Sequence, residues 1–103
     1  MKAKKQKQVT AADFFAADEI GSIDGIDLEG KLVIVRPDSF QEKYRVRKLL
    51  VFRANGGFGC KPECSGTSVF ARCVGDGESC RLRRQQIAGL FLGDESKLTE
   101  SNP

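Results

Sequence analysis

Apolar and polar residues follow one another in short runs along most of the chain, and this pattern predicts strands more than helices. Residues 32–35, LVIV, form an apolar and mostly β-branched run that is typical of a buried strand. Residues 44–53, YRVRKLLVFR, alternate well enough to predict one long strand. Residues 68–74 and 79–84 predict two more strands, joined at 75–78 by a GDGE turn in which Asp-Gly favours a tight hairpin.

The two ends of this β-rich region carry different signals. Thr10 and Asp13 form a capping-box pattern, which predicts that a short helix begins there and spans residues 11–19. Near the other end, residues 84–93 predict a helical turn that leads into a last short strand. The polar segments 1–9 and 94–103 show no periodicity, so we expect a disordered basic tail and a disordered polar tail.

Together these elements predict a mainly β fold in a single domain at residues 10–93. One short N-terminal helix and about five short strands fit a small, partly open SH3-like barrel or a curled antiparallel sheet. An OB-like barrel produces a similar pattern, so the sequence leaves the closure of the sheet open. The chain of 103 residues is too short for a second core.

The net charge of +3 hides an uneven distribution of charge along the chain. Residues 31–84 carry twelve Lys and Arg against five acidic residues, whereas the segments on both sides have more acidic than basic residues. A basic central region suits an anionic partner. Scattered arginines on the solvated face of a sheet give the same count, so the charge alone does not decide between the two.

Alternation along residues 44–53 would place three arginines on one face of the predicted strand, together with Leu49 and Val51. Further arginines follow in the segment 79–84. The candidate contacts for nucleic-acid phosphates are Arg45, Arg47, Arg53, Arg81, Arg83 and Arg84. No aromatic residue is interleaved with the three arginines of residues 44–53, which counts against binding of single strands by base stacking.

Three phenylalanines are candidates for a contact with a protein partner: Phe14, Phe15 and Phe58. Phe14 and Phe15 belong to the acidic predicted helix and either pack against the sheet or face a partner. Phe58 lies in the loop GGFG, where it either folds back over the core or projects outward as a wedge. The loop is not a phosphate-binding loop, because no Gly-Lys-Ser/Thr follows it.

The four cysteines have the spacing C-x3-C-x8-C-x6-C. Ordinary thiols without a metal are the favoured interpretation, and we expect no cofactor. The alternative is a structural zinc site formed by Cys60, Cys64, Cys73 and Cys80. A two-residue hairpin loop at Asp76 and Gly77 would place Cys73 directly across from Cys80, as a shared metal requires. A disulfide joining Cys73 to Cys80, or Cys60 to Cys64, is a further alternative, which an oxidising compartment would favour.

The chain contains no histidine, which removes His-based triads and most acid–base pairs that work at neutral pH. We therefore expect a protein that is not an enzyme. The basic start has no apolar segment behind it, and no apolar run approaches the roughly 18 residues of a membrane span. The expected location is the cytoplasm, without membrane association.

Residues 56–59 (GGFG), 76–78 (DGE) and 87–89 (IAG) together resemble a group of small uncharacterised bacterial domains met in phage and plasmid gene contexts. The resemblance covers residues 31–92, and its motifs are structural turns. It does not include Cys64, Cys73 or Cys80. It implies no activity and at most an accessory protein.

The sequence thus predicts a non-enzymatic, small β-barrel binding module, with an unknown protein as its first-choice partner. A nucleic-acid-binding module that uses the arginine-rich strand face, with or without the zinc site, is the alternative. The oligomeric state is left open.

Overall fold

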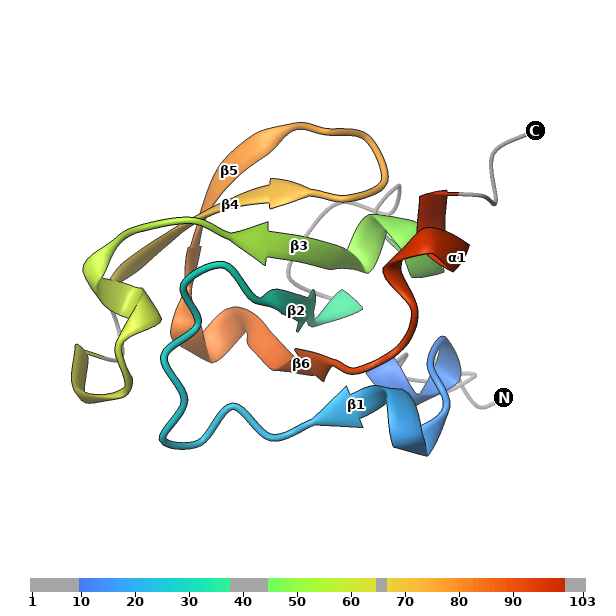
Figure 1. Ribbon diagram of the computed structural model, residues 1–103, viewed down its shortest axis with the longest axis horizontal. Helices are drawn as coiled ribbons and strands as arrows, with labels where there is room; N and C mark the ends of the chain where they lie inside the picture. The colour runs from blue at the N-terminus through green and yellow to red at the C-terminus, as the bar shows by residue number, and fades with distance from the viewer. Residues whose placement is uncertain (1–9, 38–44, 65–66, 100–103) are drawn as a thin grey trace, which may run out of the picture.

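The computed structural model describes residues 10–37, 45–64 and 67–99, with the side chains of Cys64 and Thr99 excepted. These residues form one six-stranded antiparallel sheet with the strand order β1-β6-β2-β3-β4-β5 (Figure 1). The strands are β1 (Ile20–Gly21), β2 (Leu32–Val35), β3 (Val51–Ala54), β4 (Ser68–Cys73), β5 (Ser79–Arg83) and β6 (Ile87–Phe91). The sheet is not closed into a barrel, so the predicted mainly β fold, a curled sheet or partly open barrel, is confirmed.

The inner face of the curled sheet carries the larger hydrophobic core. Strand β4 shows how the sequence specifies this face, because Val69, Ala71 and Cys73 are buried while Phe70 and Arg72 between them are exposed. Phe52 of β3 enters the same core. The core also contains Leu28, Val33, Val35, Ala54, Cys60, Leu82 and Ile87.

A second, smaller core lies on the outer face, over the half of the sheet formed by β6, β2 and β3. Its buried members are Phe15, Ile34, Leu50, Val51, Phe91 and Leu98. Leu98 belongs to the short helix α1 (Glu95–Thr99). Strand β2 is buried on both faces for this reason, which explains its uninterrupted apolar sequence. The outer face of β4 and β5 has no such cover, since Phe70, Arg72, Arg81 and Arg83 are exposed there.

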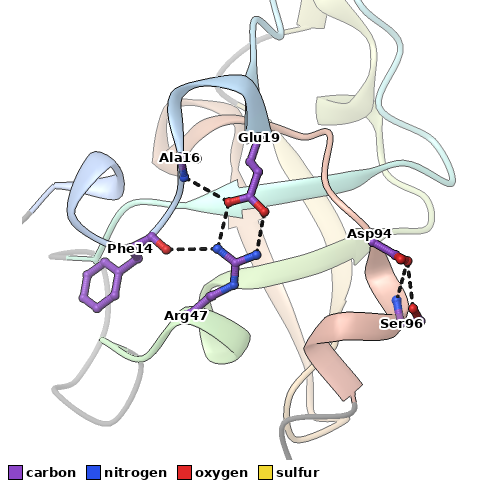
Figure 2. A network of polar contacts seen from close by, with 6 residues as sticks. All are labelled: Phe14, Ala16, Glu19, Arg47, Asp94 and Ser96. Atoms are coloured by element: carbon purple, nitrogen blue, oxygen red, sulfur yellow. Dashed lines mark hydrogen bonds and ion pairs between the residues drawn. The ribbon is translucent and has the colours of Figure 1, made fainter.

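Arg47 organises the outer core (Figure 2). Its two terminal nitrogens donate to the two carboxylate oxygens of Glu19 at 2.8 and 2.7 Å, and one of them also donates to the carbonyl oxygen of Phe14 at 3.0 Å. The guanidinium carbon lies 4.9 Å from the ring centroid of Phe15 and 5.8 Å from that of Phe91. One arginine therefore joins the N-terminal segment to the sheet by an ion pair and by cation–π contacts.

The predicted helix at 11–19 is wrong as a continuous element. The chain forms two 3-10 turns, η1 (Ala11–Asp13) and η2 (Ala17–Glu19), separated by extended backbone at Ala16. The capping-box contact is formed, because the backbone N–H of Thr10 donates to Asp13 at 2.8 Å. A helix this short is marginal in water, and breaking it lets Phe15 enter the outer core while Glu19 reaches Arg47.

The predicted strand at 44–53 is wrong in its described first half. Arg47–Leu50 forms the 3-10 turn η5, and only Val51–Ala54 pairs as a strand. The turn places Leu50 in the outer core and Leu49 against the inner core, and a regular strand would also put these two side chains on opposite faces. Unlike a strand, the turn also brings Arg47 to Glu19. Residue 44 lies outside the described residues.

The expected disorder of residues 94–103 is wrong for residues 94–99. Both the backbone N–H and the hydroxyl of Ser96 donate to Asp94 just before α1, which lowers the pKa of Asp94 (Figure 2). Leu98 is 1% exposed, and Glu95 accepts a 2.6 Å bond from Arg53. Apolar burial and this ion pair hold a segment that local sequence marks as polar. Residues 1–9 and 100–103 lie outside the described residues.

Replacing Glu19 by Gln should lower the free energy of unfolding at neutral pH, because it removes the ion pair with Arg47. Both partners are partly exposed to solvent, which limits the expected loss to about 1–2 kcal/mol. The hydrogen bonds from Arg47 lower the pKa of Glu19 from 4.5 to about 2. The folded-state pKa is depressed, so the contribution is complete above pH 4.5 and is lost as the pH falls toward about 2. Urea unfolding at several pH values measures this.

The matched control is Asp18→Asn, which changes an exposed acid of the same turn. Its effect should stay within about 0.5 kcal/mol. A deficit for Glu19→Gln that remained constant down to pH 2 would contradict the assigned role of the ion pair.

Candidate functional site

The exposed outer face of β3, β4 and β5 carries four arginines, and we call it the basic sheet face: Arg53, Arg72, Arg81 and Arg83. Period-two alternation brings them to one side, because the intervening residues are buried or half-buried in the inner core. None of these three strands contains an acidic residue. The face is therefore positive along three adjacent strands.

Strand register places the side chains of the basic sheet face in defined pairs. Arg53 lies opposite Arg72, and Phe70 lies opposite Arg81. Like charges directly opposite each other destabilise a sheet, and the Arg53–Glu95 ion pair relieves this at one end. In the described part of the chain, Arg72, Arg81 and Arg83 form no ion pair. Their charge is available to a ligand.

The GGFG loop extends this face beyond the end of β3. The N–H of Asn55 donates to the carbonyl oxygen of Phe70 at 2.8 Å, and the N–H of Phe70 donates to that of Gly56 at 2.9 Å. Gly57 has a φ of 97°, and a Cβ there would overlap the carbonyl oxygen of Ser68. Only glycine accepts both the positive φ and the close approach. The loop is thereby pressed against β4.

Phe58 follows at the start of the 3-10 turn η6 (Phe58–Cys60) and is 73% exposed. It does not fold over the core, so that alternative is wrong. Together with Phe70, which is 49% exposed, it lines an open cleft of about 630 Å³. We call this the phenylalanine cleft, and its lining residues are Gly57, Phe58, Lys61, Thr67, Ser68 and Phe70. Ser68 lies opposite Arg83, so the cleft opens onto the basic sheet face.

Arg84 binds the backbone of the loop that carries Phe58. Its guanidinium donates to the carbonyl oxygens of Gly59 and Cys60 in η6 and to those of Ile23 and Ile26, at distances of 2.5–3.3 Å. Arg84 is only 7% exposed. It fixes the loop that displays Phe58 and is not exposed to a ligand.

The structure separates the six arginines that the sequence grouped as phosphate contacts. Arg81 and Arg83 lie together on the basic sheet face, with Arg53 at its border beside Glu95. Arg47 is held by Glu19, and Arg84 is buried. Arg45 is exposed just before η5, which leads into β3, and β4 lies between β3 and β5.

Two residues of the face were missed from the sequence, Phe70 and Arg72. Their signal was present, since both occupy the polar phase of the segment SVFARC, opposite to Val69 and Ala71. The absence of an interleaved aromatic residue was expected only for the arginines of residues 44–53; on the basic sheet face, Phe70 lies opposite Arg81 and lines the cleft. The pair formed by β4 and β5 carries the surface that residues 44–53 were expected to carry.

The three predicted protein-binding phenylalanines do not share a surface. Phe15 is 4% exposed and packs edge-to-face on Phe91 with ring centroids 5.7 Å apart. Phe14 is half-buried against the same outer core. Only Phe58 is fully presented to solvent, and η6 lies at the opposite end of the molecule from η1 and η2 (Figure 1).

The hairpin register differs from the one that the zinc alternative assumed. Ala71, not Cys73, lies opposite Cys80, and the N–H of Cys73 donates to the carbonyl oxygen of Glu78, which makes a four-residue loop at 74–77. The described cysteines Cys60, Cys73 and Cys80 are free thiols. Among the described residues no three His, Cys, Asp or Glu side chains gather as a metal site. The side chain of Cys64 lies outside the described residues.

Of the three described thiols, those of Cys60 and Cys73 are buried in the inner core, and that of Cys80 is partly buried against it. The thiol of Cys60 donates to the carbonyl oxygen of Gly56 at 3.2 Å, and that of Cys73 lies 3.7 Å from the carbonyl oxygen of Leu49. Burial raises the pKa of Cys60, Cys73 and Cys80. A raised pKa lowers the fraction of reactive thiolate, so these residues act as small core side chains.

Comparison of the chain with protein-family models, with curated proteins and with solved structures finds no significant match. The proposed relation to small phage- and plasmid-associated domains stays a prediction. Within the described residues, no helix has the length and apolar character needed to cross a membrane.

Gly57→Ala should destabilise the fold by more than about 2 kcal/mol, because it adds steric overlap with the Ser68 carbonyl to an unfavourable φ. Gly77→Ala is the matched control, since Gly77 has a φ of 76° but open space around its Cβ position. The control should cost about 1 kcal/mol. Chemical denaturation of both variants measures the difference, and equal losses would contradict the close packing of the loop on β4.

Cys60 and Cys73 should resist alkylation by iodoacetamide in the native protein at neutral pH, because both are buried and their pKa values are raised. Both should react fully in denaturant. Peptide mass spectrometry reads each site separately, and elemental analysis of the same sample tests the zinc alternative. Rapid native alkylation of Cys60 would contradict the described packing, and one zinc per chain would contradict the assignment of free thiols.

Proposed function

We propose that the chain is a non-enzymatic nucleic-acid-binding module that contacts phosphates through the basic sheet face. The observation that carries the proposal is the set of three guanidiniums without an ion pair among the described residues, those of Arg72, Arg81 and Arg83, on strands that contain no acidic residue. Phosphates along a nucleic-acid backbone match such a row of positive charges.

A folded face of this kind binds better than scattered surface charges because the strands fix its geometry. Arg81 and Arg83 are two residues apart on β5 and project to the same side, about 7 Å apart along the strand. Arg72 lies on the neighbouring strand, diagonal to Arg81 and directly opposite Ser79. A ligand backbone that follows β5 meets these charges without reordering the protein chain.

The non-enzymatic part of the proposal rests on the chemistry of the whole sequence and of the described thiols. The chain has no histidine, and the described cysteines have raised pKa values because they are buried. Neither group supplies the base or nucleophile that common hydrolytic sites need. The proposal requires no cofactor.

A protein partner, the first choice from the sequence, has weaker support. Its contact surface was expected to combine Phe14, Phe15 and Phe58, and these residues lie in separate places with Phe15 buried. An acidic protein segment could still occupy the basic sheet face, since carboxylates also pair with arginine. The competition experiment below separates the two ligands.

The double variant Arg81→Ala/Arg83→Ala should weaken binding of fluorescein-labelled DNA by at least about 10-fold at low salt. The slope of log K against log salt concentration should become shallower by about 1.4–1.8, which corresponds to two lost phosphate contacts. Fluorescence anisotropy across a salt series measures both quantities, using single strands and duplexes.

The charge-matched control is Arg45→Ala/Lys97→Ala, which removes two exposed positive charges away from β5. Its affinity and salt slope should stay close to those of the unmodified protein. Equal weakening by both double variants would contradict a localised site. Competition by polyglutamate as strong as competition by DNA of equal charge would indicate an acidic protein partner instead.

A further inference from the structure

We infer that the phenylalanine cleft receives an unstacked base, so that the chain prefers single-stranded nucleic acid to a duplex. This inference rests on the proposed function and adds the form of nucleic acid that is recognised. It follows from where the two exposed aromatic rings, Phe58 and Phe70, lie relative to the arginines.

Phe70 has arginines as neighbours on its own strand and on the adjacent strand. Arg81 is directly opposite on β5, Arg72 follows two residues along β4 on the same face, and Arg83 is diagonal to Phe70. On one face of an antiparallel pair, the Cβ atoms of directly opposite residues lie about 4.5–5.5 Å apart, and diagonal neighbours lie about 7–8 Å apart. A base on the Phe70 ring would therefore have guanidiniums on more than one side to take its flanking phosphates.

Phe58 forms the other wall of the cleft, and the protein holds it in solvent. The loop that carries it cannot relax toward the core, because Gly57 and Gly59 pack directly against the backbone of residues 67–68. Arg84 fixes the following carbonyls of the turn. A large apolar ring that is 73% exposed is thus carried by a fixed backbone, so that binding would order only the side chain.

The same arrangement favours single strands over duplexes. Bases in a duplex are stacked inside the helix, so aromatic rings on a sheet reach their faces only when the strand is open. The hydroxyl-bearing residue Ser68 lines the cleft and offers a group for a base edge. Lys61 also lines the cleft, with its ammonium 4.0 Å from a carboxylate oxygen of Asp27.

Anisotropy titrations should compare a fluorescein-labelled thymidine oligonucleotide of about 12 nucleotides with a duplex of the same length at low salt. The unmodified protein should bind the single strand more tightly by about 5-fold or more. Phe58→Ala and Phe70→Leu should each reduce single-strand affinity by about 5-fold or more and leave duplex affinity nearly unchanged.

Leu92→Ala is the matched control, because Leu92 is also a large exposed apolar residue, at 58%, but lies outside the cleft. It should leave both affinities unchanged. Thermal unfolding of each variant confirms that it is folded, and Phe58→Ala keeps the test decisive if Phe70→Leu unfolds, since Phe58 makes little contact with the core.

A spectroscopic variant tests stacking directly. The chain contains no Trp, so Phe58→Trp introduces a single reporter at the wall of the cleft. Stacking on a base should quench its fluorescence on addition of the single strand, with affinity equal to or above that of the unmodified protein. Quenching should be absent on addition of polyglutamate.

The outcomes separate the inference from the proposed function. Binding that depends on Arg81 and Arg83 but not on the two phenylalanines, with equal affinity for single strands and duplexes, would overturn the inference and leave the proposed function standing. No binding of either form would overturn both. Quenching by polyglutamate with loss of affinity in Phe58→Ala would assign the cleft to an acidic protein partner and also overturn both.

Discussion

The buried guanidinium of Arg84 is the constraint on which the rest of this structure depends. Within the described residues it has no carboxylate partner, and four backbone carbonyl oxygens accept its hydrogen bonds instead. Burying a charge is costly unless such bonds are complete, and removing the guanidinium would take one donor from each of four carbonyls, of which those of Ile23 and Cys60 also accept a backbone N–H. Arg84 thereby ties the segment before β2 and the turn η6 to the start of β6, and the position of Phe58 follows from that attachment.

Arginine side chains are ion-paired on the covered half of the outer sheet face and exposed on the other half. Over β6, β2 and β3 the apolar residues are covered, and Arg47 joins the covering segment to the sheet through Glu19, Phe15 and Phe91. Over β4 and β5 the cover stops, and the outward residues become polar or aromatic. The Arg53–Glu95 pair marks the border between the two regions, where α1 ends the apolar cover. A single curled sheet thus buries its inner face and half of its outer face, and leaves the other half of the outer face exposed.

The apolar run at 32–35 and alternation at 68–74 and 79–84 were sufficient to predict strands, to within one residue at their ends, because each side chain there responds to the local pleat of the sheet. It was insufficient at Arg47 and Arg84, whose partners are 28 and up to 61 residues away in sequence. Nothing local distinguishes Arg83, which faces solvent, from Arg84, which is buried beside it. The hairpin register also failed, since GDGE is compatible with a two-residue loop while the chain forms a four-residue loop at 74–77. The alternation along each strand therefore predicts which residues of the candidate site face outward. Their position next to Phe58 depends on the fold and could not be predicted from the sequence.

The strand order also bears on how the molecule assembles. The β4–β5 hairpin pairs residues close in sequence, whereas β1 meets β6 and Arg84 meets Ile23 only after a long loop has closed. Contacts between distant residues form late, because the chain entropy of closure is lost before they contribute. We therefore expect the arginines and Phe70 of the hairpin to be aligned early in folding, and the bonds of Arg84 to Ile23 and Ile26 to form last. Partial unfolding should reverse this order, so that a chain that still presents its positive hairpin has already lost the attachment of Arg84 to the segment before β2.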